Sequence, residues 1–186
     1  MTWLPGSDLV GDFTWCGLDT DVAVTDKVMD VLLERFGGFE AGPVEMVDDP
    51  AVLRGKRRKP RVRLPYEGPP LHELWVTAWA HLDRQGSSAE LEFSCGTCGT
   101  EQWQLYGVER WDSHFDAERW QLVETKTERL LGAGVMVRAE ELAGAAVFRV
   151  HEFPGWPFCT DPVRALIEQE GFTNVAFLEM GDVVND

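Results

Sequence analysis

Two stretches far apart in the chain share one pattern, and this repetition constrains the fold more than any other feature. The stretches are 25-TDKVMDVLLERFGGFEAGPVEM-46 and 160-TDPVRALIEQEGFTNVAFLEM-180. Each begins Thr-Asp-x-Val, continues with apolar residues at helical spacing, reaches Gly-Phe and ends on Glu-Met. We therefore expect an amphipathic helix in each stretch, followed by a strand.

Local signals delimit both predicted helices. A Thr-Asp pair opens each stretch, and either side chain, at Thr25 or Asp26 and at Thr160 or Asp161, can accept hydrogen bonds from the free amides of a first turn. Glycines at the far end can adopt the left-handed conformation that ends a helix. Strands should follow through Val44–Val47 and Val175–Leu178. The predicted apolar faces comprise Val28, Val31, Leu32, Phe36, Val163, Leu166 and Ile167.

Apolar and aromatic runs also precede both predicted helices. There are two such runs each time, at 12–15, 22–24, 147–150 and 156–159. Each half of the chain thus has the order strand, strand, helix, strand. We predict an α+β fold with two similar units, residues 12–47 and 143–183, within a single domain 1–186.

A different region joins the two predicted units. Residues 54–70 are rich in charge and proline, which is typical of an exposed connection. A hairpin region, 71–108, should follow, with 74–82 pairing with 89–94; a helix over 74–82 is the alternative, because the apolar spacing fits both. The sequence then predicts a strand over 101–108 and helical or turn structure in the polar segment before 134.

Charge is unevenly distributed along the chain. The formal net charge is −15, yet 54-RGKRRKPRVR-63 holds seven of the 17 basic residues and no acidic one. The remainder has 10 basic and 32 acidic residues, a balance of −22. Such a surface repels nucleic acid and membranes and attracts a basic partner, although an acidic surface also serves solubility alone.

The sequence predicts neither a membrane span nor a secretion signal. No apolar run approaches the ~20 residues of a membrane helix. The segment 1-MTWLPGSDLVGDF-13 lacks the basic and apolar regions of a signal peptide. We therefore expect a cytoplasmic protein with no membrane partner, whose four cysteines are reduced, metal-bound or buried.

Two cysteines lie close together in 93-FSCGTCGTEQW-103, and they are the candidate metal ligands. A structural Zn²⁺ site needs four ligands, whereas Cys95 and Cys98 supply two. Bound zinc and two reduced thiols in a hairpin turn therefore remain alternative interpretations. A thioredoxin-like redox pair is disfavoured because a strand-like run, not a helix, follows the motif. Candidates for the missing ligands are Cys16, Cys159, His72, His81, His114 and His151.

No residue pattern in the sequence predicts an enzyme. The two cysteines outside the CxxC motif, Cys16 and Cys159, lie among apolar residues and are expected to be small buried side chains. The sequence has no glycine-rich phosphate loop and no nucleophile with a base near it in the chain. A nucleophilic role for Cys95 or Cys98 is the enzymatic alternative, and it requires a thiol that ionises below neutral pH.

The C-terminal run 143–183 resembles the myxobacterial double-CxxCG-motif proteins, which are regarded as immunity proteins paired with polymorphic toxins, including toxins exchanged between kin and non-kin cells. That family has a CxxCG late in the chain, matched by Cys95, Cys98 and Gly99, and an early CxxC. The early motif corresponds to 4-LPGSDLVGDFTW-15, where the flanking residues are present and both cysteines are absent. The C-terminal pattern is carried by Phe148, Arg149, Phe153, Thr160, Asp161, Val163, Gly171, Phe172, Phe177 and Glu179.

The resemblance implies an immunity protein that neutralises a cognate toxin, by occluding or distorting its active site. It also implies a zinc-ribbon-like CxxCG turn, with one half of the paired motif lost. The acidic chain suits a toxin that is a basic nuclease. The alternative is a small zinc-ribbon-like nucleic-acid-binding or regulatory protein that uses 54–63 on phosphates, which the acidity elsewhere opposes.

Overall fold

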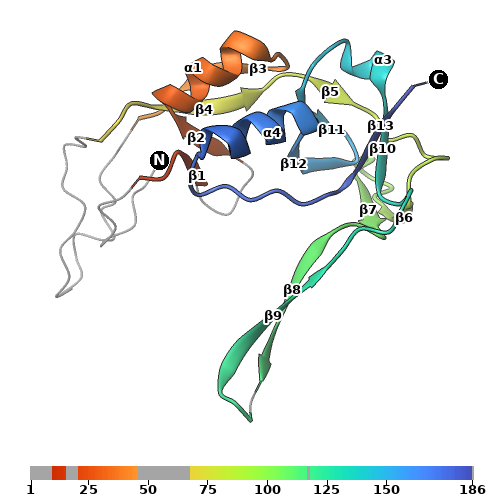
Figure 1. Ribbon diagram of the computed structural model, residues 1–186. Helices are drawn as coiled ribbons and strands as arrows, with labels where there is room; N and C mark the ends of the chain where they lie inside the picture. Colours follow the sequence, from red (N-terminus) through yellow and green to blue (C-terminus); the bar gives the residue numbers. More distant parts are fainter. Residues whose placement is uncertain (1–9, 16–20, 46–67, 117, 186) are drawn as a thin grey trace. The chain divides into compact units, whose positions relative to one another are not determined.

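The computed structural model describes residues 10–15, 21–45, 68–116 and 118–185 (Figure 1). The basic run 54–63, Cys16 and residues 4–9 of the degenerate first motif lie outside these residues. The described chain has the predicted α+β class, with small, mostly antiparallel sheets and a few helices. None of its helices has the length and apolar character needed to cross a membrane.

The chain forms two compact units, described here one at a time. Unit 1 takes in Met1–Ala78, Ala145–Arg149 and Gly155–Val175. Unit 2 takes in Trp79–Gly144, Val150–Pro154 and Ala176–Asp186. Two strands, β11 (Val147–Val150) and β12 (Phe153–Cys159), contribute residues to both units.

Unit 1 contains a four-stranded antiparallel sheet in the order β1-β2-β4-β3. Strand β2 is buried along its whole length, and helix α1 packs against β2 and β4. The second long helix, α4, also belongs to this unit. The elements are β1 (Phe13–Trp15), β2 (Val22–Thr25), α1 (Asp26–Arg35), β3 (Phe39–Pro43), β4 (Leu71–Val76) and α4 (Asp161–Glu170).

The two predicted helices are confirmed. Each has ten residues, and α4 ends at Gly171 in the left-handed conformation, as expected. The buried side chains are Val28, Met29 and Leu32 in α1 and Val163, Leu166 and Ile167 in α4. The threonines occupy the predicted N-cap positions, but the predicted capping bonds are absent, because neither threonine makes a side-chain capping bond. The Thr25 hydroxyl instead donates to Asp12 Oδ1, 3.4 Å away.

The strands predicted after the helices are displaced. After α1 the strand lies earlier than predicted, at Phe39–Pro43, because Gly38 turns the chain with φ +100°. Of the predicted segment Val44–Val47, residues 44 and 45 form no strand, and residues 46 and 47 lie outside the described residues. The Gly38 carbonyl accepts hydrogen bonds from the amides of Thr77 and Ala78, which brings β3 beside β4. Residues 175–178 form no strand; β13 begins only at Gly181.

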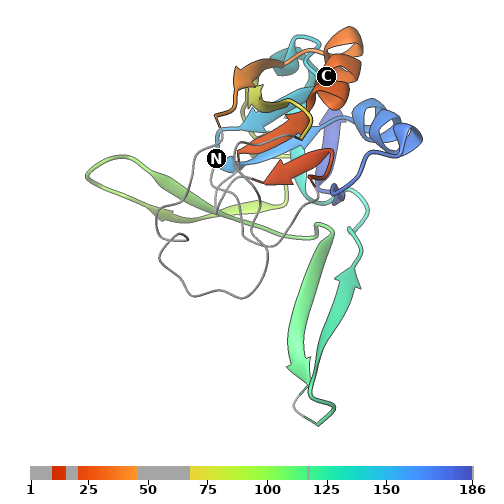
Figure 2. The ribbon, with the colours of Figure 1, turned by 90° about the vertical axis from the view of Figure 1, so that its left-hand side faces the viewer.

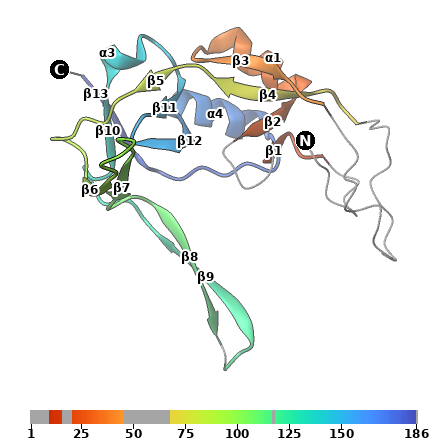
Figure 3. The same cartoon turned by 180° about the vertical axis from the view of Figure 1, so that it is seen from behind.

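Unit 2 is built from short strands and one short helix. The unit includes two separate hairpins, β6–β7 and β8–β9, each a two-stranded antiparallel sheet (Figure 2). A parallel pair, β10–β13, is a further two-stranded sheet of this unit, and Figure 3 shows these two strands from behind. The elements are β5 (Trp79–Ala80), β6 (Ala89–Ser94), β7 (Glu101–Leu105), β8 (Arg110–Asp116), β9 (Gln121–Thr127), β10 (Val135–Arg138), α3 (Ala139–Leu142) and β13 (Gly181–Val184).

Two predictions for this central region are wrong. Residues 74–82 do not pair with 89–94: β4 pairs with β2 and β3, and β6 pairs with β7. The polar segment before residue 134, predicted to be helical or turn, forms mostly the strands β8 and β9, with turns at residues 118–120 and 131–132. The first error missed the long-range pairing of β4 with β2, and the second missed a local hairpin.

Candidate functional site

The CxxCG motif forms the turn between β6 and β7. The Cys95 amide donates to the Thr100 carbonyl at 2.8 Å, and the Gly99 amide donates to the Cys95 carbonyl at 2.9 Å. Gly99 adopts φ +73°, a conformation in which glycine avoids the strain of a side chain. The turn therefore holds Cys95 and Cys98 together at one end of a hairpin, as the hairpin-turn interpretation requires.

The thiols of Cys98 and Cys159 differ in acidity. The hydrogen bond with the Thr100 hydroxyl, then those with the Thr100 amide and the Cys95 thiol, lower the pKa of the exposed Cys98 thiol to about 7. By contrast, burial raises the pKa of Cys159 to about 11. A substantial fraction of Cys98 is therefore thiolate, the form that binds metal or reacts, at neutral pH.

The described residues do not complete a zinc site around these thiols. No group of three or more His, Cys, Asp or Glu side chains in the described part of the chain has an arrangement able to hold a metal ion. Among the predicted candidates, His72 contacts Asp26, while His81 and His151 contact each other. One chain thus holds two candidate thiol ligands in one turn. Its described residues do not supply the two further ligands that a tetrahedral zinc site needs.

A polar cluster in unit 2 brings together residues that lie about 70 positions apart in the sequence, His81 and Arg84 on one side and His151 and Glu152 on the other. The carboxylate of Glu152 is 5% exposed; it accepts a hydrogen bond from the Leu82 amide at 3.0 Å and lies 3.6 Å from His81 Nδ1 and 3.8 Å from Arg84. The His151 ring stacks on the His81 ring at 4.3 Å. The His151 amide donates to the Ala80 carbonyl, so strand pairing, which no local pattern signals, creates this cluster.

The β8–β9 hairpin exposes an apolar and aromatic surface. Directly opposed residues share a face, and the register places Phe115 opposite Leu122 and Trp111 opposite Lys126. Trp120, 81% exposed, packs edge-on against Phe115 with ring centroids 5.2 Å apart. We call this set the hairpin face: Trp111, Ser113, Phe115, Trp120, Leu122, Glu124 and Lys126.

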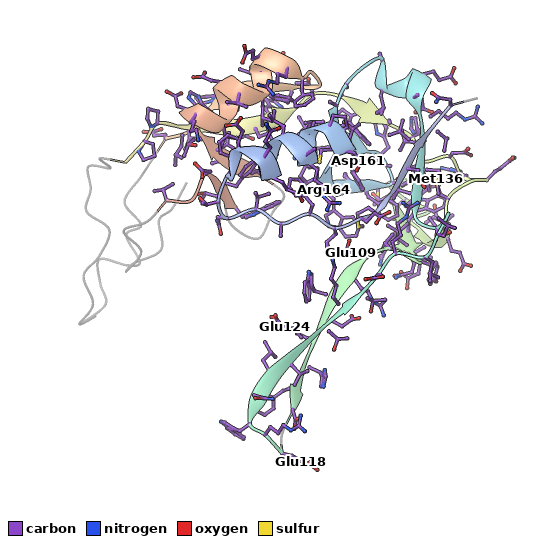
Figure 4. All side chains as sticks on the ribbon, in the orientation of Figure 1. Glu109, Glu118, Glu124, Met136, Asp161 and Arg164 are labelled. Atoms are coloured by element: carbon purple, nitrogen blue, oxygen red, sulfur yellow. The ribbon has the colours of Figure 1, made fainter. Side chains whose placement is uncertain are left out.

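One ion pair and two hydrogen bonds hold the base of this hairpin in unit 2. Glu109 forms an ion pair with Lys126 and accepts a hydrogen bond from the Glu179 amide at 2.8 Å. The Glu109 amide in turn donates to the Glu179 carbonyl at 3.0 Å. Figure 4 shows Glu109 at the base of the hairpin, Glu124 along it and Glu118 at its end. The hairpin is therefore anchored at one end, and its strands pair only with each other among the described residues.

No protein-family model, no curated protein and no solved structure matches this chain. The resemblance to the double-CxxCG immunity proteins accordingly stays a prediction. The geometry contributes two candidate sites of its own: the CxxCG turn, which the sequence predicted, and the hairpin face, which it did not.

Proposed function

We propose that this chain is a cytoplasmic immunity protein that neutralises a bacterial toxin by binding it, and that the hairpin face is a docking surface. The observation that supports this proposal is the β8–β9 hairpin. Two strands with no further sheet partner are marginally stable in water, and large apolar side chains on such an element are costly to leave exposed. A partner that covers the hairpin face would remove both costs.

The composition of the hairpin face supports a protein partner. Tryptophan is enriched among the residues that dominate binding energy, and aromatic rings bury large areas while losing few rotatable bonds. Trp111, Phe115, Trp120 and Leu122 are all more than half exposed. Glu124 and Lys126 add charge at the same surface, which would orient a partner.

The net charge supports a basic toxin, such as a nuclease. A chain of net charge −15 attracts a cationic protein over distances of about 10 Å at moderate ionic strength. The same charge opposes binding of the chain to nucleic acid. In this proposal the chain acts by occluding the toxin, without catalysis of its own.

The second part of the proposal concerns the sequence pattern that the two halves of the chain share. We take residues 12–47 and 143–183 as two copies of one α/β unit. The support is that α1 and α4 have equal length, follow an N-cap threonine and bury the same helical face.

Co-expression with the toxin encoded by the neighbouring gene tests the proposal. We expect the chain to protect cells and to form a stoichiometric complex with the purified toxin. The proposal fails if the wild-type chain neither protects nor binds.

A variant pair tests the docking surface separately. The double variant Trp111→Ala/Phe115→Ala should bind at least about 700-fold more weakly, because each anchor contributes about 2 kcal/mol or more. Trp75→Ala is the matched control, since Trp75 is 56% exposed, against 57% for Trp111, but lies in β4 of unit 1. Equal affinity of the double variant and the wild type would exclude the hairpin face while leaving toxin binding intact.

A further inference from the structure

The CxxCG turn presents half of a tetrahedral metal site. Two hydrogen bonds across the turn, Cys95 amide to Thr100 carbonyl and Gly99 amide to Cys95 carbonyl, fix its backbone. The Cys98 side chain is exposed, and its thiol lies 3.2 Å from the Thr100 hydroxyl. A hydroxyl is a poor ligand for Zn²⁺ beside thiolates, so this turn offers two sulfur ligands and an open side.

The two missing ligands are not found beside the turn in the described residues. No third His, Cys, Asp or Glu joins the two cysteines in an arrangement able to hold a metal ion there. A Zn²⁺ ion bound by two thiolates alone would keep two open positions, unlike the closed sites of structural zinc. A second CxxCG turn would fill both positions with ligands of the same kind.

We propose that Cys95 and Cys98 of two copies of this chain bind one Zn²⁺ ion between them, so that the CxxCG turn is a metal-dependent dimer contact. Four thiols supply the four ligands. Each thiol transfers its proton to solvent or buffer on binding, and neither sulfur nor zinc changes oxidation state. The symmetry is that of a closed dimer, because the same surface of each copy contributes.

The side chains near the turn fit this contact. Phe93, two residues before Cys95, is 57% exposed, and Leu91 is also exposed. A second copy across the ion would cover part of this apolar area. Both residues belong to β6, the strand that leads into the turn, so the covered area adjoins the metal ligands.

Charge makes the contact dependent on the metal. Glu92 lies in β6 beside the turn, Glu101 in β7 forms an ion pair with Arg84, and each copy has a net charge of −15. Two copies therefore repel each other at this surface, and the thiolates bound to Zn²⁺ must supply the attraction. Added salt screens this repulsion and should tighten the zinc-bound dimer, opposite to its effect on binding of a basic toxin. The dimer and toxin binding are independent proposals.

Zinc content and molecular mass together test the proposal on the full chain. The reduced protein is loaded with zinc, dialysed, and measured by elemental analysis and light scattering. We expect one Zn²⁺ per two chains and twice the monomer mass, with the mass halved after treatment with a chelator. Cobalt in place of zinc should give the absorption spectrum of four thiolate ligands in a tetrahedron. One Zn²⁺ per monomer, or no retained zinc, would overturn the proposal.

Cysteine variants locate the ligands. Cys95→Ser/Cys98→Ser should bind no zinc and stay monomeric, with a circular dichroism spectrum like that of the metal-free wild type. Cys159→Ser and Cys16→Ser are the matched controls and should retain both the zinc and the dimer. If Cys16→Ser loses the metal, Cys16 completes the site and the shared-ion proposal is wrong. If the double variant still dimerises with zinc, the ligands lie elsewhere.

Discussion

Arg129 holds the end of unit 2 that includes strand β13, and its replacement gives a sharp test of the structure. The side chain is 6% exposed, and its guanidinium donates to the Ala133 carbonyl at 2.7 Å and to the Gly181 carbonyl at 3.2 Å. It also forms ion pairs with Asp182 and with Glu179. Arg129→Met keeps most of the side-chain volume while removing all these contacts.

The expected cost follows from the exposure of the partners. The carboxylates of Glu179 and Asp182 are more than half exposed, so water replaces the guanidinium when it is removed, and each ion pair contributes about 0.5–1 kcal/mol. The hydrogen bonds to the carbonyls of Ala133 and Gly181 contribute about 1 kcal/mol each. Arg129→Met should therefore lower the free energy of unfolding by about 3 kcal/mol.

This loss should depend on pH. The hydrogen bond from Arg129 holds the pKa of Asp182 below its ordinary value. Because the pKa is lower in the folded state, this contribution is complete above the ordinary pKa of about 4 and is lost as the pH falls through the lowered folded-state value. The difference in the free energy of unfolding between the wild type and Arg129→Met should therefore become smaller in acid.

Urea unfolding at pH 7 and at pH 3, followed by circular dichroism, measures both effects. Arg110→Met serves as the control, because the side chain of Arg110 is 65% exposed, and this variant should change stability by less than about 0.5 kcal/mol. Equal midpoints for the two variants at pH 7 would refute the role assigned to Arg129. If the difference in stability between the wild type and Arg129→Met were larger at pH 3 than at pH 7, the role assigned to Asp182 would be refuted.

Two further predictions follow from burial and from thiol acidity. Leu32→Ala removes a side chain that is 1% exposed in α1 and should cost about 2–5 kcal/mol of stability, whereas Leu33→Ala, on the exposed side of the same helix, should cost little. Comparable urea midpoints for these two variants would contradict the helix orientation. In the metal-free chain, iodoacetamide should modify Cys98 with a half-maximal rate near pH 7, while Cys159 stays slow until about pH 11, as mass spectrometry would show. Similar rates of modification for both thiols at neutral pH would contradict an exposed, hydrogen-bonded Cys98 and a buried Cys159.

Local patterns predicted the helices because the information lies within each segment. Val28 and Leu32 are one helical turn apart in sequence and are both buried in α1. The start of the following strand was missed because Gly38 directs the chain into a long-range pairing, Phe39 opposite Val76. Sequence periodicity does not encode that contact.

The hairpin β8–β9 could have been predicted from alternation. Trp111 and Phe115 lie four positions apart with polar residues between them, so they fall on one face of a strand, a spacing that fits a period of two. Exposed polar residues on both strands suggested a turn or helix instead, because the expected buried face is missing. The CxxCG turn was predicted correctly between two strands, although its first strand pairs with 101–105 and not with 74–82.

Hydrogen exchange on the complex with the cognate toxin tests the central claim most directly. The backbone amides of residues 110–127 lie in a hairpin whose outer edges have no partner among the described residues, so they should exchange quickly in the free chain. We predict that toxin binding protects these amides more than those of β1–β4 in unit 1. A tight complex in which residues 110–127 exchange as fast as in the free chain would contradict the account.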